Sequence, residues 1–215
     1  MADADRRLTH PAAEPDNTPW QASVLGAVAG YADTVAYLSW GAFAGLMSGN
    51  TVMLGIAIAH GAGFTALHHA GIIAAFMCGI AVSATLRQHG LPFYGVIAIE
   101  ASLVVSAAFM PALVAAPTLA FAMGLQNAAA THFRGATLNT VFVTGDLQKL
   151  VQAVLHHGAP ESRAAIRVIT VLWSSYLAGV VLGALACTLL SKPLLLAAIV
   201  LPTVLLRRSP VALHE

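Results

Sequence analysis

The stretch from residue 21 to residue 61 reads QASVLGAVAGYADTVAYLSWGAFAGLMSGNTVMLGIAIAHG, and Asp33 is its one charged residue. A second long stretch, residues 89–132, contains only Glu100 as a charged residue. Each has room for several membrane-spanning helices, because a helix needs about 20 apolar residues to cross the hydrocarbon core. Charged residues make up 9% of the chain, whereas soluble domains carry about 25%. The sequence therefore predicts an all-α polytopic membrane protein whose surroundings are the lipid bilayer.

Two triplets interrupt these apolar runs. Ser48-Gly49-Asn50 lies within the segment 42–60, and Thr144-Gly145-Asp146 lies within the segment 137–157. Glycine permits a turn, and short polar side chains can satisfy the free N–H groups where a helix begins. We expect each triplet to break a helix and start another. Inside a membrane such a break persists only where protein covers it or where it lines a wet cavity.

The triplets belong to a longer internal repeat. Gly30-Tyr-Ala-Asp33 corresponds to Gly124-Leu-Gln-Asn127, and FMCGIAVSA at 76–84 corresponds to YLAGVVLGA at 176–184. Further along, Pro92 corresponds to Pro193. With the His-Gly pair that closes each interrupted segment, at Gly61 and at Gly158, five such matches occur in the same order, and their offset grows slowly along the chain. We interpret residues 21–113 as a first membrane repeat and residues 116–206 as a second.

Two topologies are open. If the interrupted segments cross fully, the chain has eight spans and its halves are parallel. If they return to the side they entered, it has six spans plus two re-entrant helices, and the halves are inverted. With the N-terminus inside, the six-span arrangement places every arginine on the cytoplasmic side and leaves Lys192 outside. The positive-inside rule therefore favours six spans.

The ends of the chain complete this prediction. Residues 1–20 are polar and proline-containing, and we expect a disordered cytoplasmic tail there, followed at the other end by a second tail at 207–215. Both termini are then cytoplasmic, and the chain is a multi-pass protein of the bacterial inner (plasma) membrane.

The quoted motifs also resemble a known family. GAVAGYADTVAYL (26–38) with GLMSGNTVMLG (45–55), and AMGLQNAA (122–129) with VFVTGDLQKL (141–150), are similar to the YoaK-like family of bacterial inner-membrane proteins, domain of unknown function 1275. The resemblance extends over about residues 20 to 206. Ser48 stands where the family pattern leads us to expect threonine, which keeps the hydroxyl. The resemblance implies a permease-like membrane protein and no particular substrate.

Polar groups inside apolar spans are the candidate site residues, because an ionisable group in a membrane is costly unless it faces a cavity or a partner. The candidates for substrate or ion binding are Asp33, Ser48, Gly49, Asn50, Gln126, Asn127, Thr144, Gly145 and Asp146. Each half offers one carboxylate and one amide at exchanged positions, and the two pairs could converge on one cavity. Burial disfavours the charged form of a carboxylate, which would suit proton binding and release. The alternatives are helix–helix hydrogen bonds for Asp33 and Asn127, and helix capping for Asn50 and Asp146.

Glu100 is a separate candidate, a coupling carboxylate without a polar counterpart near Val200 in the other half. The alternatives are an interhelical hydrogen bond and a side chain that snorkels to the membrane surface. His60 and His157 are expected to end the helices of the interrupted segments. Glycines with the spacing of tight helix packing are Gly26, Gly30, Gly79, Gly179 and Gly183, together with Ser83.

Inverted repeats with interrupted helices are typical of secondary transporters, whose solute site lies where the breaks meet. The sequence therefore favours a small-solute transporter, which is coupled to protons if the carboxylates bind and release them during transport. The alternatives are a passive channel or facilitator, and a structural or regulatory membrane protein. An enzyme is not expected, because no histidine lies mid-span to act as a base for Ser48. We expect no cofactor, no metal site and no nucleic-acid partner, and a homo-oligomer stays open.

Overall fold

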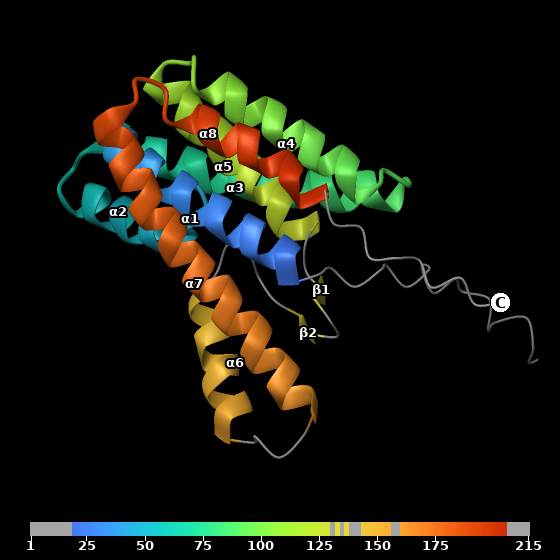
Figure 1. Cartoon of the computed structure of the whole chain (residues 1–215). Helices are drawn as coiled ribbons and strands as arrows, with labels where there is room; N and C mark the ends of the chain where they lie inside the picture. Colours follow the sequence, from blue (N-terminus) through green and yellow to red (C-terminus); the bar gives the residue numbers. More distant parts are fainter. Residues whose placement is uncertain (1–18, 130–131, 134–135, 138–142, 156–159, 206–215) are drawn as a thin grey trace, which may run out of the picture.

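The computed structural model describes residues 19–129, 132–133, 136–137, 143–155 and 160–205 (Figure 1). The predicted tails therefore lie almost wholly outside the described residues. The described chain is helical apart from one short antiparallel pair, β1 (His132–Phe133) with β2 (Ala136–Thr137). Its helices are α1 (Pro19–Trp40), α2 (Met47–Ala59), α3 (Gly63–Gln88), α4 (Phe93–Ala107), α5 (Ala112–Ala129), α6 (Val143–Leu155), α7 (Pro160–Leu189), α8 (Leu194–Val200) and the 3-10 helix η2 (Leu201–Leu205). The all-α prediction is confirmed.

Three helices are long and apolar enough to cross a membrane by length and composition: α3, α5 and the part of α7 from Ile166 to Leu189. At 1.5 Å per residue the 26 residues of α3 extend about 39 Å, more than the hydrocarbon core of about 30 Å. Their outward faces carry large exposed apolar side chains, such as Leu67 and Leu182. Lipid accounts for such exposure, so this is a polytopic membrane protein.

Two central helices organise the bundle. α1 packs along α7, and α5 packs along α3 and also against α4. α1 and α5 touch each other as well, and both are buried over much of their surface. Figure 1 shows α1 enclosed by neighbours from both halves of the chain. The first helix of each half thus packs against the third helix of the other half.

The predicted glycine contacts are confirmed at both of these crossings. A Cβ on Gly30 would overlap the backbone of Tyr176, and a Cβ on Gly179 would overlap the carbonyl of Ala27. At the other crossing, a Cβ on Gly124 would overlap the carbonyl of Phe76.

A Cβ on Gly79 would likewise meet the carbonyl of Phe121. Only glycine allows backbones to approach this closely, as in helix pairs within membranes generally. The two crossings use residues that correspond under the sequence alignment of the halves, Gly30 with Gly124 and Gly79 with Gly179.

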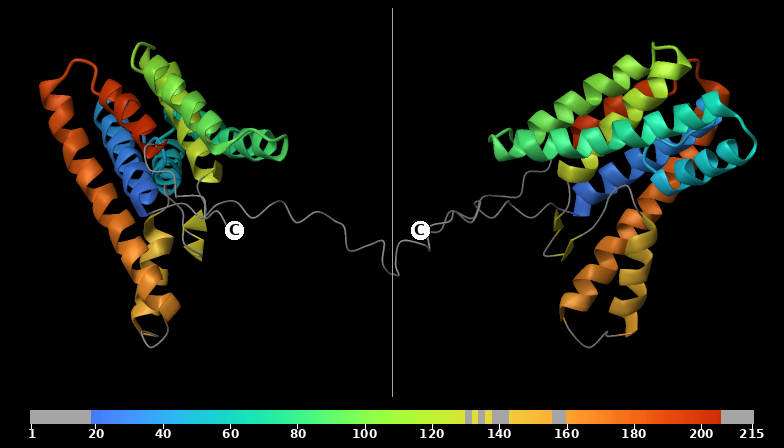
Figure 2. Two further views of the ribbon diagram at one scale, coloured as in Figure 1. Left: turned by 45° about the vertical axis from the view of Figure 1, so that its right-hand side comes forward. Right: turned by 180° about the vertical axis from the view of Figure 1, so that it is seen from behind.

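α2 is short and begins part-way along α1. The right-hand view in Figure 2 shows that α1 ends, and α3 begins, at the same end of the bundle. The backbone N–H groups of Gly45 and Leu46 bond to Asp33, which precedes the end of α1 by about 10 Å of helix. The chain therefore turns back along α1 after Trp40, and the 13 residues of α2 return it to the end where α3 starts.

The structure corrects several predicted boundaries. The triplet Ser48-Gly49-Asn50 does not break a helix, because it forms the first turn of α2, and the break is the non-helical stretch 41–46 before it. Gly41 adopts φ 70° there, the left-handed conformation that glycine allows. α4 ends at Ala107 rather than at 113, and α5 ends at Ala129, before the β1–β2 pair that the apolar pattern did not predict. His60 caps the end of α2, as predicted, whereas His157 lies outside the described residues.

Candidate functional site

Asp33 fastens the break to α1 and α7. Its Oδ1 accepts hydrogen bonds from the N–H groups of Gly45 at 2.6 Å and Leu46 at 3.1 Å. Its Oδ2 accepts a hydrogen bond from the hydroxyl of Tyr176 on α7, at 2.7 Å. The carboxylate is almost completely buried. These bonds satisfy N–H groups next to the start of α2 and give the buried charge the partners it needs.

Asn50 closes the same break from the α2 side. Its Oδ1 accepts from the N–H of Phe43 at 3.0 Å, and its Nδ2 donates to the carbonyl of Phe43 at 2.8 Å. The Phe43 ring stacks on Tyr37 of α1 with centroids 4.8 Å apart. It also covers Gly49 so closely that a Cβ there would meet the ring at 2.7 Å. Asp33 and Asn50 therefore both bind the backbone of one loop and hold it together, whereas the sequence led us to expect that they would line a shared cavity.

The second triplet also lies in the first turn of a helix but makes different contacts. Thr144 and Gly145 belong to the first turn of α6, and Gly145 has nothing within 4 Å of the position where a Cβ would lie. Asp146 is buried and pairs with Lys149 at 2.9 Å. α6 packs on α7 and lies toward the opposite end from α2 (Figure 1). The expected meeting of Asp146 with Asp33 and Asn50 is therefore not seen in the described part of the chain.

α5 contributes the amides Gln126 and Asn127. Gln126 is completely buried and donates from Nε2 to the carbonyl of Leu25 on α1, at 3.2 Å. The buried Oδ1 of Asn127 has no hydrogen-bond partner among the described residues. Asn127 corresponds to Asp33 in the repeat, so the polar group that anchors the break in one half has an open acceptor in the other. Ser48, by contrast, is exposed on α2.

Glu100 is the most unusual polar residue of the described chain. It is 0% exposed, and neither Oε1 nor Oε2 has a hydrogen-bond partner there. Val96, one turn earlier on the same face of α4, packs with Leu125 and Ala129 of α5. The face that carries Glu100 is thus directed at the central helix α5, in an apolar setting. An isolated ionised carboxylate would be very unfavourable there, so the setting favours the protonated acid.

Comparison with known proteins places this arrangement in a family. The sequence profile described as "Protein of unknown function (DUF1275)" matches residues 21–206, which include every helix of the described chain except the first two residues of α1. The chain belongs to the DUF1275 family. It is 27% identical over 147 residues to "UPF0700 transmembrane protein YoaK" of Bacillus subtilis (strain 168), an alignment that covers 61% of this chain and 65% of the relative. No solved structure matches the chain.

In this DUF1275 protein the sequence pattern identified Asp33, Asn50 and Glu100 as polar residues within apolar segments but missed the partners of Asp33 and Asn50. Tyr176 corresponds to Phe76 in the other half, which has no hydroxyl, so the repeat gave no sign of its bond to Asp33. Phe43 is bound through its backbone, and a backbone partner leaves no trace in residue type. Among the residues searched, no group of three or more His, Cys, Asp or Glu side chains is placed to hold a metal ion.

Proposed function

We propose that this protein is a small-solute permease of the bacterial inner membrane, and not an enzyme, in which transport is coupled to protonation of Glu100. The observation that carries the proposal is the complete burial of Glu100 with both carboxylate oxygens unpartnered within the described structure. A buried polar group without a partner weakens the fold, and an ionisable group at membrane depth is most often functional.

The coupling follows from the two states of this carboxyl group. In the closed, apolar setting the neutral acid is favoured, so the group keeps its proton. When water reaches α4 the ionised form becomes stable, and the proton can leave. A carrier that exposes Glu100 alternately to the two sides would therefore move protons together with its solute. Asn127 on the neighbouring helix α5 adds an open acceptor that a polar solute could use.

The proposal includes an inverted duplication with six spans and both termini in the cytoplasm. Its support is the reciprocal packing, α1 on α7 and α5 on α3, through corresponding glycines. The segment 41–59 leaves the end of α1 and comes back to that end of the bundle, which supports a re-entrant segment. Arg87, at the end of α3, and Lys192, after α7, lie at opposite ends of the bundle, as the positive-inside rule requires.

Reconstituted transport tests this proposal. The full chain would be placed in proteoliposomes with a trapped pH indicator, and a panel of amino acids, carboxylates, amides and aromatic solutes would be applied with and without a pH gradient. We expect solute-dependent proton movement in the wild type and its loss in Glu100→Gln. Glu161→Gln, at the start of α7, is the matched neutralisation and should retain it.

The other outcomes identify the alternatives. Solute flux that ignores the pH gradient and survives Glu100→Gln would overturn coupling and indicate a passive facilitator. A folded protein that moves none of the solutes would contradict the permease and indicate a structural or regulatory role.

A further inference from the structure

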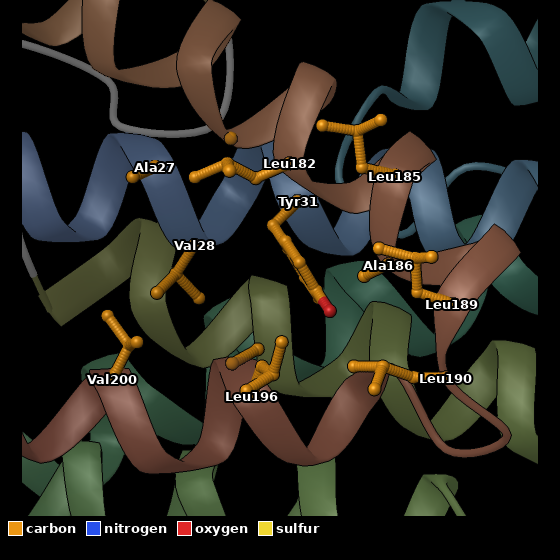
Figure 3. Close-up of a pocket in the computed structure, with 12 residues that line it drawn as sticks. Ala27, Val28, Tyr31, Leu182, Leu185, Ala186, Leu189, Leu190, Leu196 and Val200 are labelled. Carbon is orange, nitrogen blue, oxygen red and sulfur yellow. The ribbon is translucent and has the colours of Figure 1, made fainter.

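An apolar groove runs between α1, α7 and α8. Its volume is about 490 Å³, within the range of about 300–1,000 Å³ for ligand pockets. Small residues from all three helices, including Ala27, Gly179 and Ala197, leave the room for it. Leucines of α7 and α8 form its rim, and Leu189 is 78% exposed. Figure 3 shows Tyr31 reaching across from α1 toward α8 between these side chains.

A second, more polar hollow lies further along α1. A smaller hollow of about 170 Å³ is lined by Val35 and Ser39 of α1 and by Lys192 of the α7–α8 turn. Residues 27, 31, 35 and 39 follow one another on one face of α1, so the two hollows succeed each other along that helix. Between them the Tyr31 hydroxyl donates to the carbonyl of Pro193 at 2.7 Å.

The ammonium group of Lys192 can still bind a further hydrogen-bond acceptor. Its Nζ donates to the carbonyl of Ala108 at 2.7 Å and lies 5.1 Å from the centroid of the Phe109 ring. An ammonium has three donors, and no carboxylate of the described chain pairs with this one. Trp40 lines the same hollow. Lysine with aromatic side chains marks the level where apolar core meets headgroups.

The corresponding seam in the other half carries different side chains. Under the alignment of the halves, Phe121 takes the place of Ala27, and Leu125 takes the place of Tyr31. Leu125 packs with Val96, and Phe121 packs against the same cluster. The small Ala27 that lines the groove on α1 is thus replaced in the other half by the larger Phe121, which packs against a cluster that includes Val96 of α4.

We propose that this groove binds one acyl chain of an anionic phospholipid whose phosphate pairs with Lys192. An acyl chain fits an apolar channel that opens sideways on membrane helices, and its headgroup would lie at the aromatic, lysine-bearing end. The proposal rests on the chain being a membrane protein and is independent of solute transport and of Glu100.

Lipid titration tests the proposal. Delipidated full-length protein in detergent would be titrated with phosphatidylglycerol or phosphatidylcholine, and bound lipid would be counted by native mass spectrometry. We expect one site that prefers phosphatidylglycerol at least tenfold. Lys192→Gln should remove most of this preference, and Ala27→Phe, which fills the groove, should weaken both lipids.

The matched controls are Arg163→Gln, an exposed cation near the start of α7, and Ala81→Phe on the outer surface of α3, and both should bind like the wild type. Equal affinity for the two lipids, or equal losses in Lys192→Gln and Arg163→Gln, would overturn the proposal. Binding of inorganic phosphate with no added effect of the acyl chain would also overturn it. A protein dimer that Ala27→Phe dissociates would assign the groove to a second copy instead.

Discussion

At the scale of single residues, Glu100 has a cost that can be measured. A buried polar group without a partner destabilises a protein by about 1–3 kcal/mol relative to an apolar group of similar shape. We therefore expect Glu100→Met to raise the free energy of unfolding by about 1–3 kcal/mol, while abolishing proton coupling. Thermal unfolding in detergent measures the change, with Ser102→Met on the exposed face of the same helix as the control. A destabilised Glu100→Met would reveal a partner for the carboxylate.

Asp33 should behave differently, because its oxygens already serve the fold. Asn retains one acceptor for the N–H groups of Gly45 and Leu46, and the Tyr176 hydroxyl can accept from the new amide. We expect Asp33→Asn to fold and function nearly normally. Asp33→Leu strands these groups in the interior and should cost about 3–5 kcal/mol. The free energies of unfolding of Asp33→Asn and Asp33→Leu, measured side by side, test this prediction. Equal destabilisation would mean that the negative charge of Asp33 is itself required.

At the scale of the elements, the α1–α7 crossing depends on the absence of a Cβ. Gly30→Ala would place a methyl group against the backbone of Tyr176, so the helices must separate, and we expect a loss of more than about 3 kcal/mol. Gly71→Ala on α3 meets nothing within 4 Å and should stabilise by about 0.5–1 kcal/mol through helix propensity. Melting temperatures of the pair test the crossing. If Gly30→Ala melts like the wild type, the close approach of the α1 and α7 backbones at this crossing is wrong.

The helices were predictable from sequence, and the start of α2 was not. Long apolar runs specify helices by hydrophobicity alone, so helices were predicted within residues 21–113 and 116–206, with errors at their ends. The break was misplaced because a Ser-Gly-Asn triplet resembles a helix breaker locally. The actual stop depends on the bonds from Gly45 and Leu46 to Asp33, and between Phe43 and Asn50, which form only after the chain folds back. Burial of Glu100 depends on α4 packing against α5, and a single sequence contains no signal for that contact.

At the scale of the whole molecule, topology is the property to establish. In a variant lacking Cys78 and Cys187, single cysteines at Ala62, His89 and Ser191 would be exposed to an impermeant thiol reagent on intact cells. The six-span arrangement predicts labelling at 62 and 191 and protection at 89. Eight spans predict labelling at 89 and 191 and protection at 62. Position 191 is outside in both and serves as the positive control.

The exchange of first helices between the halves also has a consequence for biogenesis. Asp33 and Tyr176 are 143 residues apart in sequence, so at about 5–20 residues per second the ribosome needs on the order of 10 s to supply the partner of the first helix. During that time α1 leaves the translocon with an unpaired acid and an uncovered glycine face. The early helices must therefore stay at the translocon, or bound to an insertase, until α7 has been inserted. Neither half is a self-sufficient folding unit, and a chain truncated after α5 should be cleared by membrane proteases.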